Sequence, residues 1–377
     1  MFNGKGIQQL LKANEEVLSD LVALEAILNH RFANMEEAIR CLMLSAASGE
    51  AMLLVGPPGT AKSRLIRVFC ILTNILEDDP GGRNLQKSGL HEIKRDSKYF
   101  TYLLTQFTEP AELFGYFDIA ALTGTQPELK KLDEHSMQRA RIVFLDEVFN
   151  ASSAILNALL TFMNEREIHD RGKIFRTPVQ NVFGATNFVP DGAELAAIYD
   201  RFLLRCRIEN EVAQPDNLAR LVKMGWTESY APGRMLEKDD QIRDFPNLLD
   251  GLLEMQGQIG TLAKKGELAI DTGSKLFGEL ADIVQQARDQ ELTEGSNRRI
   301  IKFARIMLFN RMLTYASEGK FEVQSPAVTE EDLLLLIRFG LDRPDQTLFR
   351  TYQKKFGLSK SGPWGDQNGP WKSPDRK

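Results

Sequence analysis

The residues best suited to chemistry are Lys62 and Ser63, which follow the loop Gly56-Pro57-Pro58-Gly59-Thr60-Ala61. An apolar run, residues 51–55, precedes this loop, and apolar residues at helical intervals follow it. A strand, a tight Gly/Pro loop and a helix in this order are typical of a phosphate-binding P-loop, whose N–H groups and helix N-terminus face a polyphosphate. Lys62 would reach the β- and γ-phosphates, and the Ser63 hydroxyl would ligate Mg²⁺.

Ala61 departs from the general pattern G-x-x-x-x-G-K-[ST], because it stands where the second glycine is expected. Residues with a Cβ rarely adopt a positive φ, so we expect Ala61 to have a negative φ. The alternative interpretation is a Gly/Pro turn before an ordinary helix. We also place Arg64 in the predicted nucleotide-binding set, and Phe32 is either a contact for the base or a packed aromatic side chain.

A second group of chemically useful residues is the carboxylate pair Asp146 and Glu147, which ends the apolar run 142–145. Such a run suits a strand buried on both faces of a parallel sheet, and open α/β sheets place their ligands at the carboxyl ends of strands. This is the Walker B arrangement, in which Asp146 holds Mg²⁺ and Glu147 orients the attacking water. The alternative is a buried strand that ends in surface acids.

Three further residues depend on position for their interpretation. Asn187 ends the apolar run 179–186 and could hydrogen-bond the attacking water or the γ-phosphate, although an Asn before a loop is usually a turn residue. Arg201 and Arg205 could reach the nucleotide of a neighbouring subunit, and the alternative for Arg201 is an ion pair with Asp200.

The remaining elements predict an α/β core followed by a helical part. Helices are expected at 7–29, 35–48 and 151–166, and a hairpin at 168–175. Beyond a boundary near residue 213 the strand signals fade, and helices are expected at 216–224, 246–256, 276–288, 299–313 and 330–341. We therefore predict a core, residues 1–213, an all-helical lid, residues 214–342, and a flexible or partner-docked tail, residues 343–377. Arg298, at a helix start, could face back to the phosphates.

Composition limits the classes of protein that remain. The chain has 377 residues, 43% hydrophobic and 26% charged, with a formal net charge of −5. This balance predicts two globular domains and disfavours a broad nucleic-acid surface, although Arg171 and Lys173 keep a nucleic-acid motor open. Cys41, Cys70 and Cys206 show no metal spacing and are predicted to be reduced core thiols. With no signal peptide and no run of ~18 apolar residues, we expect a cytoplasmic protein without a membrane span.

Taken together, these motifs resemble the MoxR family of AAA+ ATPases, in which Ala is usual at position 61. The resemblance extends over about residues 7–341 and rests on Gly56–Ser63, Phe144-Leu145-Asp146-Glu147, Ala185-Thr186-Asn187, Asp200-Arg201-Phe202 and Ser296-Asn297-Arg298. Two further stretches, Glu112-Leu113-Phe114-Gly115 and Ala197-Ile198-Tyr199-Asp200-Arg201, are similar to the RavA-like branch.

The resemblance implies a five-stranded parallel sheet, a helix-2 insert at about 108–138 and a lid that carries sensor 2. It implies ATP and Mg²⁺ as ligands, with Asn187 as sensor 1, Arg201 as the arginine finger and Arg298 as sensor 2. It also implies a homo-oligomer, a hexameric ring or spiral, that remodels protein clients as a chaperone and has a von Willebrand factor A (vWA) domain partner. The alternatives are a slow nucleotide-gated scaffold and a nucleic-acid motor.

Overall fold

The computed structural model describes residues 2, 4–76, 98–123, 131–170, 173–189, 193–209, 219, 222–223, 244–293 and 296–358. The predicted domain boundary near residue 213, most of the predicted helix 216–224, Arg171 and the tail beyond residue 358 lie outside the described residues.

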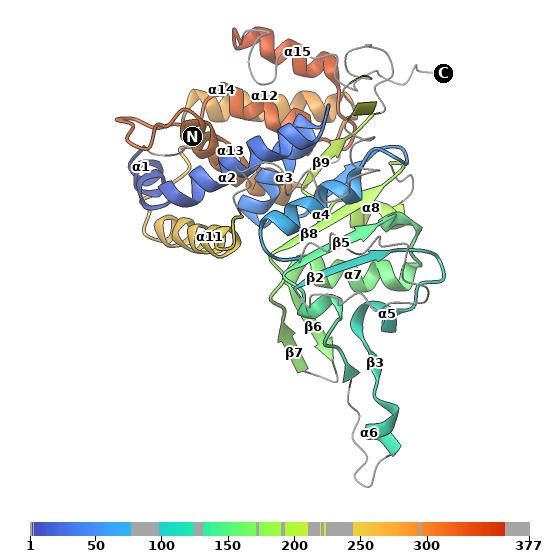
Figure 1. Cartoon of the computed structure of the whole chain (residues 1–377). Helices are drawn as coiled ribbons and strands as arrows, with labels where there is room; N and C mark the ends of the chain where they lie inside the picture. Colours follow the sequence, from blue (N-terminus) through green and yellow to red (C-terminus); the bar gives the residue numbers. More distant parts are fainter. Residues whose placement is uncertain are drawn as a thin grey trace.

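A sheet of five parallel strands forms the centre of the molecule, in the order β2-β5-β8-β1-β9 (Figure 1). Its strands are β1 (Met52–Val55), β2 (Tyr99–Leu103), β5 (Ile142–Asp146), β8 (Asn181–Thr186) and β9 (Leu204–Arg207). Val55 lies opposite Thr186, and Leu145 lies opposite Gly184, so the carboxyl ends of β1, β5 and β8 meet at one edge. The α/β class with a five-stranded parallel sheet is confirmed.

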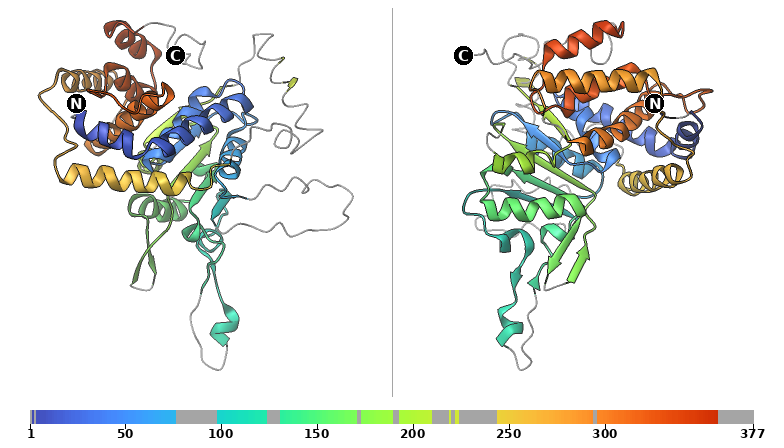
Figure 2. Two further views of the ribbon diagram at one scale, coloured as in Figure 1. Left: turned by 60° about the vertical axis from the view of Figure 1, so that its left-hand side comes forward. Right: turned by 180° about the vertical axis from the view of Figure 1, so that it is seen from behind.

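Helices cover both faces of this sheet, because successive strand side chains point to opposite faces. Met52 and Leu54 join a core with α3 (Glu36–Ser48) and α4 (Lys62–Leu72), whereas Leu53 and Val55 join a second core. Two helices, α7 (Ser153–Glu165) and α8 (Ala193–Tyr199), cover that second core, as the rear view in Figure 2 shows.

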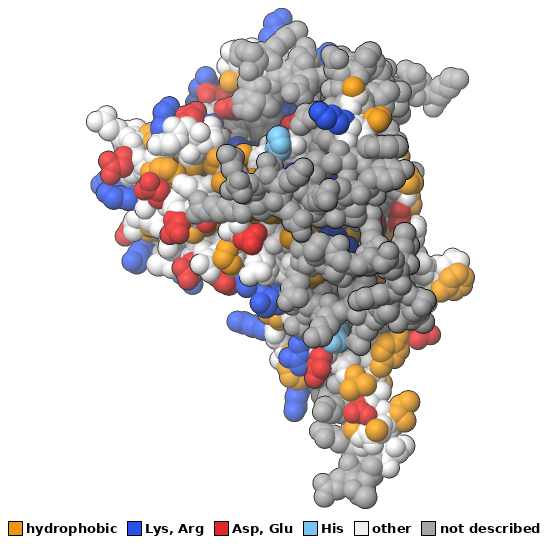
Figure 3. Space-filling view, viewed as in Figure 1, with side chains coloured by type: hydrophobic (Ala, Val, Ile, Leu, Met, Phe, Trp, Pro, Cys, Tyr) orange, Lys and Arg blue, Asp and Glu red, His pale blue; other side chains and the backbone are white. Residues whose placement is uncertain are grey.

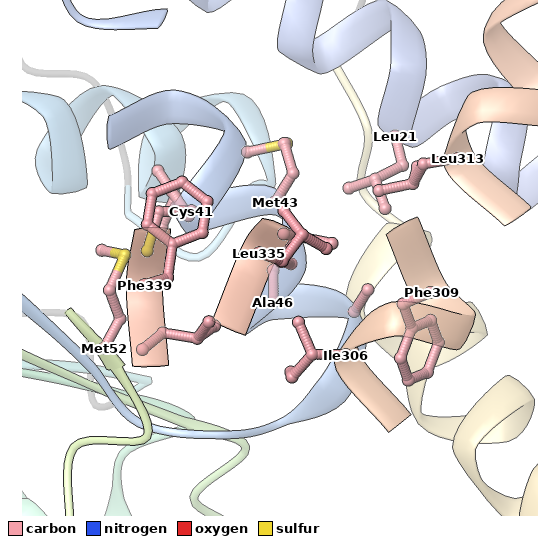
Figure 4. Packing of buried hydrophobic residues seen from close by; sticks show 14 of the residues in the cluster. Leu21, Cys41, Met43, Ala46, Met52, Ile306, Phe309, Leu313, Leu335 and Phe339 are labelled. Carbon is pink, nitrogen blue, oxygen red and sulfur yellow. The ribbon is translucent and has the colours of Figure 1, made fainter. Parts of the chain in front are cut away.

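The helices that follow the sheet pack mainly on the N-terminal helices. They are α11 (Leu248–Lys264), α12 (Lys275–Asp289), α13 (Asn297–Ser317), α14 (Glu330–Leu335) and a π-helical turn (Leu336–Gly340). Figure 4 shows Ile306 and Leu335 beside Ala46 and Met43 of α3. This helical part, residues 248–340, therefore shares one continuous core with the N-terminal helices and one sheet face. The predicted core and lid boundaries stay a prediction.

The predicted single helix at 7–29 is wrong, because the structure has α1 (Gly4–Ala13) and α2 (Glu15–Arg31) with a break at Asn14. The Asn14 amide donates to the Leu10 carbonyl and to Gln258 Oε1 of α11, each at 2.8 Å. Asn is a residue whose side chain competes with helical hydrogen bonding, and here a partner from a distant helix favours the break.

The tail prediction is also wrong at residues 346–355, which form α15 (Gln346–Lys355). Asp345 caps this helix by accepting a hydrogen bond of 2.6 Å from the Leu348 N–H. Leu348 and Tyr352, four residues apart, are buried against the helical part. Two buried residues on one helix face form too short a pattern to predict this helix from the sequence, although they suffice to dock it.

Two antiparallel ribbons project from the sheet, as Figures 1 and 2 show. The first follows α5 (Pro110–Phe114) and consists of β3 (Tyr116–Phe117), α6 (Ile119–Thr123) and β4 (Lys131–Leu132). Two short 3-10 turns, Met137–Arg139 and Val148–Asn150, come after it in the chain. The second is β6 (Glu167–Asp170) with β7 (Lys173–Arg176), the predicted hairpin. Figure 3 shows hydrophobic side chains along the first ribbon, and its exposed ones include Tyr116, Phe117 and Ile119.

The three cysteines are free and buried, as predicted, and burial raises the pKa of each thiol well above its ordinary value. Among the residues that the structure describes, no helix has the length and apolar character needed to cross a bilayer.

Gly184 in β8 lies where the fold leaves no room for a side chain. A Cβ there would lie 2.7 Å from the ring of Phe202 and 3.1 Å from Leu53. We expect Gly184→Ala to lower the free energy of unfolding by about 1–3 kcal/mol, because the buried ring must shift. Urea unfolding measures this, with Gly278→Ala on α12 as the control. That site has open space, so the control should gain stability by about 1 kcal/mol, and an equal gain at Gly184 would contradict the packing.

Candidate active site

The P-loop joins β1 to α4 and holds the ammonium group of Lys62. Its Nζ donates to the carbonyls of Gly56 (2.5 Å) and Pro57 (3.0 Å) and to Oδ1 of Asn187 (3.1 Å). Lys62 is 7% exposed, and this burial lowers its pKa, although the charges of Asp146 and Glu147 oppose that shift. The lysine is therefore held beside the loop that would carry phosphates.

Gly56 is where the chain leaves the sheet and passes close to β9. A Cβ at this position would lie 2.2 Å from the carbonyl oxygen of Ile208, so any larger residue would displace the loop. Further along, Thr60 Oγ1 donates to the Pro57 carbonyl at 2.8 Å and closes the turn. Gly56 and Thr60 thus shape the loop, whereas Lys62 and Ser63 are the candidates for contacts with phosphate and Mg²⁺.

The expected negative φ of Ala61 is wrong. Ala61 has φ 60° and ψ 22°, the left-handed conformation, and it directly precedes α4. A Cβ in this region costs roughly 1–2 kcal/mol. The loop requires this backbone direction to turn into the helix, so the alanine takes the conformation that glycine takes in the general pattern, at a cost in stability.

Ser63 and Asp146 form the oxygen pair that suits a magnesium ion. Ser63 Oγ donates to Asp146 Oδ2 at 2.8 Å, which joins the first turn of α4 to the end of β5. Hydroxyl and carboxylate oxygens are hard ligands that Mg²⁺ accepts, usually together with phosphate oxygens and water. No group of three or more His, Cys, Asp or Glu side chains able to hold a metal occurs among the described residues. The pair therefore fits an ion that arrives with a polyphosphate.

Glu147 lies next to this pair and is held by two asparagines. Asn187 Nδ2 donates to Oε1 of Glu147, and Asn150 Nδ2 lies 3.5 Å from its Oε2. Glu147 has φ 51°, and its N–H donates to Asp146 Oδ1 at 3.1 Å. Burial, with the charge of Asp146, raises the pKa of Glu147, while Lys62 opposes this. A carboxylate with a raised pKa beside an amide is suited to accept a proton from water.

The structure brings the predicted Walker residues and Asn187 together, since Asn187 contacts both Lys62 and Glu147. Asn150 was missed by the sequence analysis. It lies three residues after Glu147 in a short 3-10 turn, and an asparagine there has no distinctive pattern.

Phe32, at the end of α2, lies against Arg64 of α4. The Arg64 guanidinium carbon is 5.2 Å from the centre of the Phe32 ring, and Phe32 is 3% exposed. Phe32 is thus a packed aromatic residue next to the P-loop helix, which is the second of the two interpretations. A base contact by Phe32 and a nucleotide contact by Arg64 stay predictions.

The two candidate finger arginines differ sharply in their surroundings. Arg205 is buried, donates to Asp342 and to the Tyr199 carbonyl, and lies 3.8 Å above the Tyr199 ring. These contacts bury the guanidinium group of Arg205 and disfavour it as a finger. The Arg201 side chain is 27% exposed and lies 3.3 Å from Asp200, the ion pair given above as the alternative.

Arg298 lies exposed in the first turn of α13. Its neighbour Arg299 is buried and ion-paired with Asp200 at 3.5 Å, so the start of α13 is attached beside Arg201. The roles of Arg201 and Arg298 stay predictions.

The comparison with known families adds to this geometry. Residues 19–77 and 87–245 match the family model described as the MoxR domain in the MoxR-vWA-beta-propeller ternary systems. The chain belongs to the MoxR family of AAA+ ATPases. The RavA-like branch stays a prediction, because the description of the matched model does not name that branch.

Two uncharacterised proteins and one structural protein are similar to part of this chain. Two uncharacterised proteins of Methanocaldococcus jannaschii, MJ0079 and MJ0812, are each 32% identical, over 65% and 61% of this chain. A structural protein, ORF618, of Acidianus two-tailed virus is 29% identical over 68% of this chain and 38% of its own length. This MoxR chain spans about three fifths of the length of the two M. jannaschii relatives, 60% and 57%.

One solved structure supports the fold. A protein of Cytophaga hutchinsonii, described as a candidate ATPase, superimposes with a TM-score of 0.55 over 93% of this chain and 96% of its own. The identity is 15%, so this likeness concerns the fold alone.

Ala61 gives a direct test of the loop conformation. We expect Ala61→Gly to raise the free energy of unfolding by about 1 kcal/mol, because glycine adopts a positive φ without the Cβ clash. Urea unfolding measures the change. Ala281→Gly, on the exposed face of α12, is the matched control and should lose about 1 kcal/mol. A similar loss at both positions would contradict the left-handed conformation of Ala61.

Proposed function

We propose that this MoxR protein hydrolyses ATP with Mg²⁺ in an oligomer and uses the energy to remodel protein partners. The observation that carries the proposal is the hydrogen-bonded group Lys62, Ser63–Asp146 and Glu147–Asn187 at one edge of the sheet. Each member has the residue type and neighbour that phosphoryl transfer requires, and such transfer needs positioning and charge stabilisation more than covalent chemistry.

In this proposal each side chain has one task. Lys62 exchanges its carbonyl partners for phosphate oxygens, and the loop N–H groups orient the phosphates. Ser63 and Asp146 hold Mg²⁺, which neutralises developing charge on the phosphates when it is bound. Glu147 accepts a proton from water that Asn187 helps to orient, and its raised pKa favours that transfer.

A second subunit would complete the site. Leu204 of β9 lies opposite Met52 of β1, so Arg201, three residues earlier, belongs to the amino ends of the strands. The P-loop begins at the carboxyl end of β1. A strand of four residues separates its amino and carboxyl ends by about 13 Å. This separation supports a role for Arg201 at a neighbour's phosphates. We also propose Arg298 as sensor 2, which would face back to the phosphates and help to neutralise the developing charge.

The assembly and the partner are parts of the same proposal. An arginine that acts between subunits requires an oligomer, and we propose a hexameric ring or spiral. The matched family model concerns MoxR-vWA-beta-propeller systems, which supports a vWA domain protein as the partner. The chaperone-like activity on protein partners is our own proposal. A slow scaffold would differ in showing ATP binding without steady turnover.

Glu147→Gln tests the hydrolytic assignment. We expect phosphate release to fall about 10²–10⁴-fold, because the amide cannot accept the proton, while ATP binding persists. Steady-state phosphate release and retention of ATP on gel filtration measure the two effects. The exposed Glu134→Gln serves as a control with normal turnover. Ordinary turnover in the Glu147 variant would remove this residue from the mechanism.

Arg201→Ala tests the shared site. We expect turnover to fall about 10³–10⁵-fold, as for other arginine fingers, while the Kd for ATP stays within about twofold. Isothermal titration and phosphate release give the two quantities. Arg139→Ala is the matched control, since Arg139 forms a surface ion pair with Asp133 on the insert and should keep its turnover. Retained hydrolysis in the Arg201 variant would end the finger assignment.

A further inference from the structure

A buried ionic cluster joins the helical part to the sheet next to Arg201. Its centre is Asp342, which follows the π-helical turn and accepts hydrogen bonds from Arg299 Nη1 (2.8 Å), from Thr293 Oγ1 (2.7 Å) and from Arg205. Burial alone would raise the pKa of Asp342, but the two guanidinium groups hold it below its ordinary value. The carboxylate is therefore charged and fixes both arginines.

Both arginines are locked by additional contacts. The side chains of Arg205 and Arg299 are 3% and 6% exposed. Arg205 donates to the Tyr199 carbonyl at 2.7 Å, and Arg299 donates to the Gly340 carbonyl. Planar guanidinium groups held at several points leave little rotational freedom, so the cluster sets a defined geometry between α8, β9 and α13.

Asp200 extends this cluster to Arg201. Its Oδ1 lies 3.5 Å from Arg299 Nη1, and its Oδ2 lies 3.3 Å from Arg201 Nη1. One carboxylate thus connects an arginine of the helical part to the candidate finger. Asp342 is shared by Arg205 and Arg299, so one carboxylate faces two guanidinium groups. Asp200, 30% exposed, places a second negative charge beside Arg299.

We propose that Arg299 is a positioning residue for Arg201, acting through Asp200, so that the position of α13 sets the geometry of the finger. This inference rests on the proposed function, in which Arg201 serves a neighbour's phosphates. A shift of about 1 Å in a positioning group can cost about 10²-fold in rate. Movement of the helical part in one subunit therefore changes turnover in the next.

A second ionic contact on the same helix serves as a reference. Lys302 and Arg305 of α13 each lie 2.6 Å from the Glu50 carboxylate, which precedes β1. Lys302 is one helical turn beyond Arg299 and also joins α13 to the sheet, but it pairs with Glu50 instead of Asp200. Loss of Lys302 leaves Arg305 paired with Glu50, so α13 stays attached and the contacts from Arg299 through Asp200 to Arg201 stay intact.

Mixed oligomers provide the test, because they separate the subunit that hydrolyses ATP from the subunit that donates the finger. Arg201→Ala subunits keep the Walker residues and receive a finger. Glu147→Gln subunits cannot hydrolyse ATP but donate Arg201, so a mixture should regain phosphate release. The donor then carries a second change: Arg299→Gln, Asp200→Ala, Arg299→Lys or the control Lys302→Gln.

We expect donors that carry Lys302→Gln in addition to Glu147→Gln to restore phosphate release to the same level as donors that carry Glu147→Gln alone. The Arg299→Gln and Asp200→Ala donors should restore about 10²-fold less, with the Arg299→Lys donor intermediate because it keeps the charge. ATP binding by each donor, retained in the Glu147→Gln background, verifies its fold. Because Asp200 is half-exposed, its variant keeps the test valid if Arg299→Gln fails to fold.

The two ways of failing are distinct. If the Arg299→Gln and Asp200→Ala donors restore release as fully as the Lys302→Gln donor, the positioning role is overturned and the finger assignment stands. If the Glu147→Gln donor itself fails to restore release to Arg201→Ala subunits, the shared site is overturned, and the positioning role with it.

Discussion

The parallel pairing of β1, β8 and β5 is the constraint on which the site depends. Because these strands run in the same direction and in register, the P-loop, Asn187 and Asp146 leave the sheet at one edge. The hydrogen bond between Ser63 and Asp146 spans 83 residues of sequence, yet it requires only that two neighbouring elements end at the same level. The relative position of the site residues at this edge is thus set by the sheet more than by any one loop.

The site also contains local strain that the surrounding core supports. Ala61 and Glu147 both adopt positive φ, and Lys62 has little exposure. Each of these features costs stability, and such costs are usual where groups must be held for binding or catalysis. The two hydrophobic cores on either side of the sheet, built on alternating residues of β1, provide the packing that holds the loop in place.

The helical part combines apolar packing with charged attachment. Its helices share a core with α1–α3, which fixes their general position. Two ionic contacts, at Asp342 and at Glu50, then define the orientation of α13 against the sheet. Buried ion pairs add little net stability compared with apolar packing, but each specifies one geometry among several. The cluster around Asp342 therefore matters more for the geometry of α13 than for the stability of the fold.

The sequence alone determined the sheet class, the P-loop, the Asp146–Glu147 pair and the buried cysteines, because each depends on a local pattern of apolar residues, glycines and charges. Tertiary structure decided the rest. Arg201 and Arg205 are four residues apart and identical in type. Arg205 is buried and pairs with Asp342, 137 residues beyond it, whereas Arg201 stays partly exposed. The break at Asn14 and the docking of α15 likewise depend on partners distant in sequence, which no local pattern contains.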